Sequence, residues 1–128
     1  MLYRSMKQDG DGRPRVARAG WGLGVRIEGP DIDIPVFDGL VGPLSGGMSV
    51  GEDWSRFPPS FIPRGAEGGT CNNRRIFGLE REDIPAGLSL RSKAVEDLGL
   101  LFVEPGHRMP IEEYEDLLAS TRDAWKLV

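Results

Sequence analysis

Apolar and polar residues alternate along several short stretches of the chain, and turn residues bound most of them. A period of two is typical of a strand with one buried face. The pattern therefore predicts strands at residues 2–6, 48–50, 75–79 and 88–92. Residues 100–103 form a continuous apolar run, which predicts a central strand that ends at Pro105.

Two stretches of the first third of the chain have a weaker pattern. Between residues 15 and 27, four large apolar residues alternate with small or charged ones, and three glycines interrupt the run. Glycine disfavours a helix there, so we expect a strand or an extended segment. A short extended piece is also expected at residues 32–36.

The last part of the chain carries the one clear helical pattern. Pro110 suits a first helical position, and acidic residues follow it while Arg122 and Lys126 come near the end, as the helix dipole favours. We predict an amphipathic helix over residues 110–126, with one apolar face formed by Ile111, Tyr114, Leu117, Leu118 and Trp125. Short strands with one or two helices indicate an α+β fold, and 128 residues suit a single domain spanning 1–128.

Turn residues and a serine are most concentrated between Asp38 and Gly51. Gly46 and Gly47 allow a positive φ and a close approach of another molecule to the main chain. Ser49 follows them at the start of a predicted strand. The stretch is either a plain glycine-rich loop or a ligand site that offers N–H groups and a hydroxyl, although it matches neither common phosphate-loop fingerprint. Residues 62–73 form a second long polar loop, and loops of that length are usually functional or disordered.

The charge is negative overall and uneven along the chain. A net charge of −4 with a pI near 5.0 argues against a general nucleic-acid binder. Residues 1–27 nevertheless sum to +4 and residues 94–128 to −5. The two ends either pair with each other or leave a basic pocket for an anionic ligand. Arg4, inside the first strand, needs an anionic partner, either a core carboxylate or a ligand phosphate.

Cysteine and histidine are too few for several kinds of site. Cys71 is the single cysteine and His107 the single histidine. They permit no disulfide and form no metal-ligand cluster, so we expect no metal, and the polar surroundings of Cys71 disfavour a thiol nucleophile. We find no signal peptide and no apolar run long enough to cross a bilayer, so we expect a soluble cytoplasmic protein without membrane partners.

Five features in the same order resemble a known family. They are a Leu-Tyr-Arg start, the Asp-Gly-Leu-x-x-Pro-x-x-Gly-Gly-x-Ser-Val stretch at residues 38–50, an Asp-Ile-Pro turn at 83–85, the apolar strand closed by proline, and the terminal amphipathic helix. Together they are similar to small ADP-ribosyltransferase-fold toxins first described as antibacterial effectors of the type VI secretion system. The resemblance spans nearly the whole chain.

The resemblance implies a split, twisted β-sheet around an NAD cleft and a toxin delivered into the cytosol of a target cell. Members are usually neutralised by an immunity protein, and the acceptor in the target cell is unknown. Arg4 matches the first-strand arginine and Ser49 the motif serine. Enzymes of this fold usually add a glutamate at or just before the strand that matches residues 100–103. That strand lacks an acid here, so Asp97, and after it Glu96, are the candidates.

The expected chemistry assigns a role to each of these residues. Arg4 would pair with the NAD pyrophosphate, and Ser49 with the N–H groups of residues 46–48 (Gly46, Gly47 and Met48) would hold the nicotinamide ribose. A carboxylate would stabilise the oxocarbenium-like ribose that forms on cleavage. Tyr3 and Trp54 either stack on a ring of NAD or belong to the core. Besides an NAD-consuming enzyme, the sequence leaves open a non-catalytic member that binds a partner protein, and an unrelated interaction domain.

Overall fold

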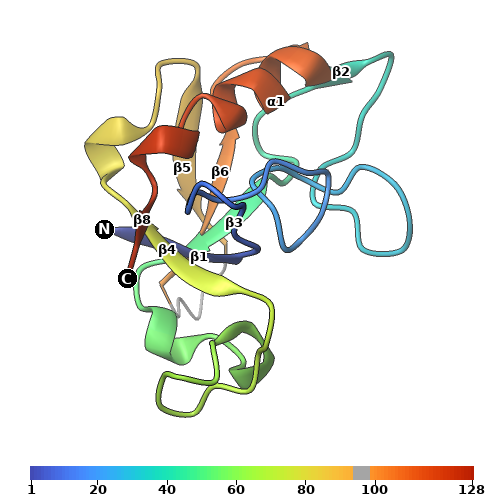
Figure 1. Cartoon of the computed structure of the whole chain (residues 1–128). Helices are drawn as coiled ribbons and strands as arrows, with labels where there is room; N and C mark the ends of the chain where they lie inside the picture. The colour runs from blue at the N-terminus through green and yellow to red at the C-terminus, as the bar shows by residue number, and fades with distance from the viewer. Residues whose placement is uncertain (94–98) are drawn as a thin grey trace.

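The chain forms an α+β fold with an antiparallel sheet and one α-helix near its C-terminus (Figure 1). The computed structural model describes residues 1–93 and 99–128. The six-stranded sheet has the order β5-β6-β3-β1-β4-β8, and β2 pairs with β7 in a separate two-stranded sheet. The strands are β1 (Leu2–Met6), β2 (Leu40–Val41), β3 (Met48–Gly51), β4 (Arg75–Leu79), β5 (Leu88–Ser92), β6 (Leu100–Pro105), β7 (Met109–Pro110) and β8 (Lys126–Leu127).

The predicted strands of the main sheet are confirmed. Those at residues 2–6, 75–79 and 88–92 have the predicted bounds, and β3 is one residue longer than expected. Strand β6 ends at Pro105, as predicted, and this proline pairs with Leu88 of β5. A proline is tolerated in a strand at its end, where no ladder hydrogen bond from its nitrogen is needed.

The stretch predicted as extended between residues 15 and 27 forms no ladder strand. It folds back on itself, with an isolated bridge between Val16 and Leu23. Gly24 has φ 159°, and a Cβ there would clash with the Ala17 carbonyl, so the glycines serve a close contact between two passes of the chain. Residues 32–36 likewise form no strand, although Ile34 is fully buried.

The C-terminal helix is shorter than predicted. Helix α1 (Ile111–Ala119) ends well before residue 126, and a 3₁₀ turn, η4 (Arg122–Ala124), and strand β8 follow it. The hydroxyls of Ser120 and Thr121 donate to the carbonyls of Leu117 and Leu118, at 2.6 and 2.7 Å. These side chains satisfy carbonyls that a longer helix would have bonded along its backbone, and so end it.

Trp125 is buried as predicted, although it lies beyond the helix. Its Nε1 donates to Thr121 Oγ1 at 2.9 Å, so the hydroxyl that helps to end α1 also fixes the tryptophan. Arg122 lies outside the helix and contacts the N-terminal part of the chain, with Nη1 2.7 Å from Asp11 and Nη2 3.0 Å from Asp9. The expected role of Arg122 at the helix dipole is therefore wrong.

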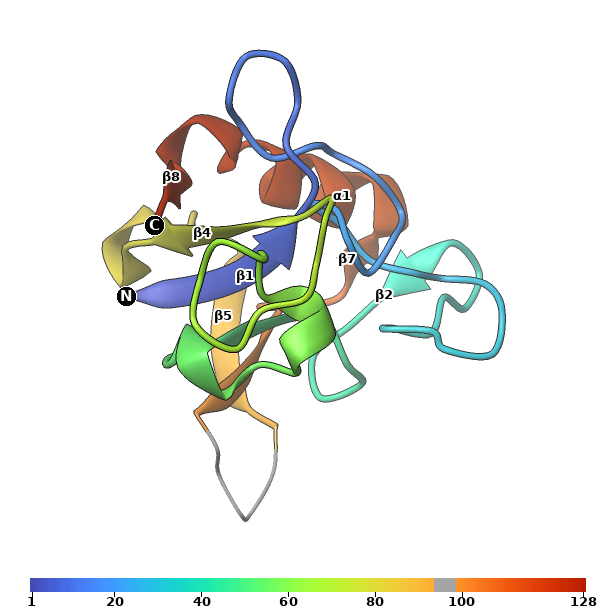
Figure 2. The same ribbon diagram turned by 60° about the horizontal axis from the view of Figure 1, so that its bottom comes forward.

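The hydrophobic core lies between one face of the sheet and helix α1 (Figures 1 and 2). Tyr114 of α1 is fully buried there. Its hydroxyl donates to the Val103 carbonyl at 2.5 Å and accepts from the Met48 N–H at 3.1 Å. Met48 and Val103 are register partners of β3 and β6, so the helix contributes a polar link to the centre of the sheet.

The opposite charges at the two ends of the chain do pair. Arg18 donates through Nε and Nη2 to the Glu115 carboxylate at 2.6 and 2.8 Å, and Arg13 lies 3.1 Å from Asp123. This pairing accounts for part of the N-terminal basic charge. It leaves out Arg4 and Arg26, which lie in the site described next.

Candidate functional site

The sheet divides between its two central strands, and Arg4 lies at the division. Strands β1 and β3 pair only at Tyr3 and Gly51, whereas β1 and β4 pair along their whole length. Arg4 Nη1 donates to the Ser49 carbonyl of β3 at 2.7 Å. The other hydrogen bonds of the guanidinium go to the carbonyls of Gly22, Gly20 and Gly24, at 3.0, 3.2 and 3.5 Å. The side chain thus holds β3 and residues 20–24 against β1.

The charge of Arg4 has no carboxylate partner among residues 1–93 and 99–128. The side chain is buried, with 7% exposure, and its partners are backbone carbonyls rather than the core carboxylate that we considered. Burial lowers the pKa of Arg4 to about 10, which leaves the guanidinium charged at neutral pH. A buried charge of this kind is costly unless an anion accompanies it.

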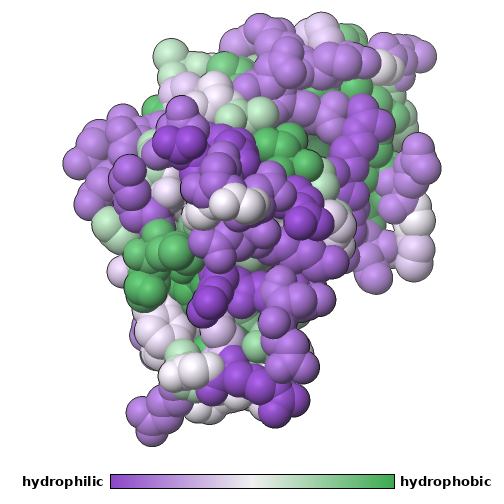
Figure 3. Space-filling model, in the orientation of Figure 1, coloured by the Kyte–Doolittle hydropathy of each residue, from purple (hydrophilic) through white to green (hydrophobic). Residues whose placement is uncertain are grey.

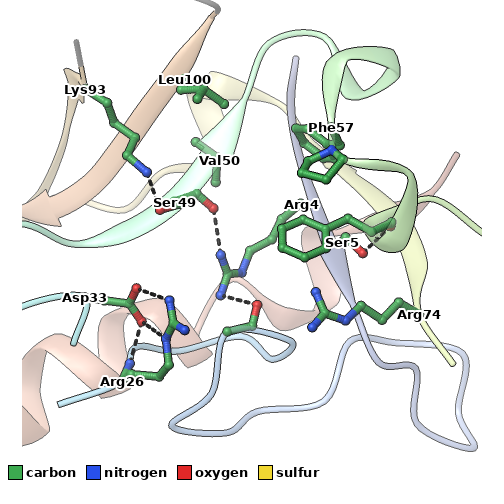
Figure 4. A pocket seen from close by; sticks show the side chains of 13 residues that line it. Arg4, Ser5, Arg26, Asp33, Ser49, Val50, Phe57, Arg74, Lys93 and Leu100 are labelled. Atoms are coloured by element: carbon green, nitrogen blue, oxygen red, sulfur yellow. Dashed lines mark hydrogen bonds and ion pairs between the residues drawn. The ribbon is translucent and has the colours of Figure 1, made fainter. Parts of the chain in front are cut away.

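A cavity of about 370 Å³, here called the Arg4 cavity, opens beside this guanidinium (Figure 4). Among the described residues, four cationic side chains and one carboxylate line it, namely Arg4, Arg26, Arg74, Lys93 and Asp33. Asp33 is engaged by Arg26, with Nη2 and Oδ1 2.9 Å apart. The positive charges of the other three residues therefore face the cavity without an ion-paired carboxylate in the described part of the chain.

Ser49 and Lys93 form one polar edge of the cavity. Lys93 Nζ donates to Ser49 Oγ at 3.0 Å, and the ammonium lies 4.9 Å from the centre of the Phe102 ring. Desolvation lowers the pKa of Lys93. On the other side the wall is apolar and aromatic, with Phe57 and Phe61, and Arg74 stacks over the Phe61 ring at 4.7 Å. The cavity therefore combines cationic groups with ring faces, a combination that suits an anionic ligand carrying an aromatic base.

The glycine pair, Gly46 and Gly47, packs closely against other backbone segments of the protein. A Cβ at Gly46 would clash with the Asp33 carbonyl, and one at Gly47 would lie 2.6 Å from the Val103 carbonyl. The Gly47 N–H donates to the Asp33 carbonyl at 2.9 Å, and the Met48 N–H donates to the Tyr114 hydroxyl. The close approach that we expected of a ligand is made by the protein's own backbone. We therefore leave Gly46, Gly47 and Met48 out of the candidate ligand contacts.

The structure brings two of the candidate residues, Arg4 and Ser49, together at the cavity, but it does not place every candidate there. Neither aromatic residue considered for ring stacking, Tyr3 or Trp54, lines it. Glu96 and Asp97 lie outside the described residues, so their expected catalytic role remains a prediction.

Sequence reasoning missed Arg26, Asp33, Arg74 and Lys93. Lys93 follows β5 directly, so a register argument from that strand would have found it. The other three lie in or beside loops, where no periodic signal marks a side chain as facing a site. Glu104, directly before the proline that ends β6, was missed too. It is buried and bonded to Arg91 Nε at 2.9 Å, and it does not line the cavity.

Comparisons of this chain with protein-family models, with curated proteins and with solved structures found no match. Among the described residues, no group of three or more His, Cys, Asp or Glu side chains could hold a metal ion. The same residues contain no helix that is long and apolar enough to cross a membrane.

Proposed function

We propose that this protein is an ADP-ribosyltransferase-fold toxin that binds NAD in the Arg4 cavity and cleaves its nicotinamide bond. The observation that carries the proposal is the buried Arg4, which has no carboxylate partner in the described chain and lies beside Arg74 and Lys93. Three such cations in a chain of net charge −4 favour an anionic ligand with more than one charge. The pyrophosphate of NAD has this character.

The division of the sheet supports the fold part of the proposal. The sequence resemblance implies a split sheet with an arginine on its first strand and a serine on the next motif strand. Strands β1 and β3 separate beside Arg4 and Ser49, which are those two residues. The toxin activity, the cytosolic delivery and the immunity protein rest on the sequence resemblance alone.

The roles of the lining residues follow from their chemistry. Arg4 uses its Nε and Nη2 groups on glycine carbonyls and one Nη1 N–H on Ser49, which leaves its charge and its second Nη1 N–H for a phosphate oxygen. Arg74 and Lys93 supply two further cations, and the rings of Phe57 and Phe61 offer faces for a base. The Ser49 hydroxyl is held by Lys93 at the edge where a ribose would lie.

The reaction breaks the bond between C1′ of the ribose and the nicotinamide nitrogen, and nicotinamide leaves with the bonding electrons. An acceptor nucleophile or water then bonds to C1′ and loses its proton. A carboxylate near the ribose stabilises the positive charge that develops. Asp97 and Glu96 are the candidates from the sequence, and Asp33 is the carboxylate that lines the described part of the cavity.

A second candidate function is a non-catalytic protein of this fold that acts by binding a partner protein. The pairing of Asp33 with Arg26 favours it, because three hydrogen bonds from Arg26 occupy both oxygens of that carboxylate. Without a free carboxylate the cavity would bind NAD but not cleave it.

Calorimetric titration of NAD into the purified protein, with nicotinamide release followed over time, tests both functions. Lys93→Gln removes one cavity cation, and we expect its affinity for NAD to fall about tenfold, as the loss of a charge-assisted hydrogen bond implies. Lys126→Gln is the matched control, because Lys126 is exposed and does not line the cavity. It should bind NAD as the wild type does.

The outcomes separate the candidates. Binding of NAD with release of nicotinamide supports the enzyme. Loss of this release in the double variant Glu96→Gln and Asp97→Asn, or in Asp33→Asn, identifies the carboxylate that the reaction uses. Binding without release supports the non-catalytic protein. No binding by the wild type refutes the NAD site, and equal binding by the two lysine variants removes Lys93 from it.

A further inference from the structure

A second cavity, of about 360 Å³, adjoins the Arg4 cavity and is lined mainly by polar side chains. We call it the arginine cavity. Three arginines and three amide side chains line it, namely Arg64, Arg74, Arg75, Gln8, Asn72 and Asn73. Figure 1 places most of this lining in the long segment between β3 and β4, below the sheet, and Figure 3 shows strongly hydrophilic residues on that part of the surface.

The three arginines differ from most arginines of the chain. Eight others form ion pairs with carboxylates, namely Arg13, Arg15, Arg18, Arg26, Arg56, Arg81, Arg91 and Arg122. No ion pair forms at Arg64, Arg74 or Arg75 within residues 1–93 and 99–128. Acidic residues outnumber basic ones in this chain, 20 to 16, so enough carboxylates exist to pair with every arginine. A shortage of carboxylates therefore does not explain why these three arginines lack an ion pair in the described chain.

The loop that carries these residues is held by its own backbone. The Cys71 N–H donates to the Ile62 carbonyl at 2.9 Å, and the Arg64 N–H donates to the Cys71 carbonyl at 3.1 Å. Gly69 packs so closely on Pro63 that a Cβ would clash with the Pro63 carbonyl. The backbone is thus fixed on both sides of the hollow, which lowers the entropy cost of presenting arginines to a ligand.

We propose that the arginine cavity binds a phosphate group of a second ligand, separate from any ligand of the Arg4 cavity. Guanidinium forks match the oxygens of phosphate, and the amide groups of Asn72 and Asn73 can donate to oxygens that the arginines leave free. An apolar ligand finds little to contact in this lining. The site goes beyond the proposed function, because its arginines attract phosphate whether or not the Arg4 cavity binds NAD.

Arg74 links the two cavities, since it lines both. Figure 4 shows its guanidinium pointing toward the Arg4 side of the wall. The two cavities therefore share Arg74 as a wall residue. If NAD occupies the Arg4 cavity, a phosphorylated molecule in the arginine cavity would lie next to it.

The test titrates three probes into the full chain at low salt: inorganic phosphate, AMP and a short single-stranded oligonucleotide. The double variant Arg64→Ala and Arg75→Ala removes two cations that are exposed and lie outside the Arg4 cavity, so it should fold as the wild type does. Arg108→Ala is the matched control, because Arg108 is also exposed and unpaired in the described chain but lines a different hollow. Circular dichroism confirms the fold of each variant.

We expect the double variant to bind all three probes at least about tenfold more weakly, as expected from the loss of charge-assisted contacts, while Arg108→Ala stays within about twofold of the wild type. Equal affinity for AMP and the oligonucleotide supports a small phosphorylated ligand, and tighter binding of the oligonucleotide supports a polymer. Wild-type affinity in the double variant, or absence of saturable binding, would overturn the proposal. NAD binding unchanged in the double variant separates this site from the Arg4 cavity, which Lys93→Gln tests.

Discussion

Replacing Tyr114 by phenylalanine should destabilise the fold without changing its core volume much. The hydroxyl is the hydrogen-bond partner of the Met48 N–H and of the Val103 carbonyl, and the side chain has no exposed surface. Tyr114→Phe leaves both backbone groups without this partner. A buried donor or acceptor left unsatisfied costs about 1–3 kcal/mol, so we expect a loss of roughly 2–4 kcal/mol in the free energy of unfolding.

The loss should leave a folded protein, because domains of this size are typically stable by about 5–15 kcal/mol. For a chain of this length, 1 kcal/mol corresponds to roughly 3–5 °C in Tm, so a decrease of about 6–20 °C is expected. Urea unfolding followed by tryptophan fluorescence measures the free energy, since Trp125 is buried near the helix. Tyr3→Phe is the control, because the Tyr3 hydroxyl has no hydrogen bond within the described chain, and it should change stability by less than about 0.5 kcal/mol.

Equal effects of the two tyrosine substitutions would refute this reasoning. A loss below about 0.5 kcal/mol in Tyr114→Phe would mean that water or a shifted strand satisfies the two backbone groups. The pH dependence gives a second check. Burial raises the pKa of Tyr114, so the folded state holds its phenolic proton more tightly than the unfolded state. The protonated Tyr114 therefore contributes to the free energy of unfolding below the ordinary tyrosine pKa, and this contribution is lost as the pH rises above that value. Tyr114→Phe has no phenolic proton, so its stability should fall less steeply at alkaline pH than that of the wild type.

Two further predictions concern the backbone contact of Gly46 with Asp33 and the charge of Lys93 at the Arg4 cavity. Gly46→Ala should lower the free energy of unfolding in urea by at least about 2 kcal/mol, because the added Cβ clashes with the Asp33 carbonyl. Gly42→Ala is the control and should cost less than about 0.5 kcal/mol, because no atom lies near the position of its added Cβ. Similar costs for the two substitutions would show that the close contact at Gly46 is unimportant. Desolvation lowers the pKa of Lys93 below the ordinary value of a lysine, and affinity for NAD should fall as the pH rises through that lowered pKa, because the ammonium loses its charge there. In Lys93→Arg the fall should move to higher pH, and an unchanged profile would contradict the role of this side chain.

Local patterns predicted most of the sheet, and tertiary contacts decided the rest. The bounds of β1, β4 and β5 were predictable because their alternation and the flanking turn residues are local signals. The end of α1 was not, because the hydroxyls of Ser120 and Thr121 bond carbonyls in the last turn while the apolar face continues as far as Trp125. An apolar period alone cannot separate one long helix from a helix followed by a buried turn.

The candidate site was predictable only in part, for a similar reason. Arg4 and Ser49 were found because each lies in a predicted strand or a recognisable motif. Asp33 and Arg74 come from segments that are distant in the sequence, and only the folding of both onto the divided sheet brings them to one cavity. The glycine pair was noticed for the correct conformational reason, but the molecule that approaches it is the protein itself.

With an anion bound in the Arg4 cavity, as we propose, the stability of this fold depends on that ligand. In the absence of a ligand, the desolvation of Arg4 opposes folding, and an anion that enters the cavity offsets this cost in the folded state alone. Folding and anion binding are then thermodynamically linked, so the protein should unfold at a higher temperature with NAD than without it, at equal pH and ionic strength. The free energy of ligand binding at the division in the sheet therefore adds to the free energy of unfolding of the whole chain.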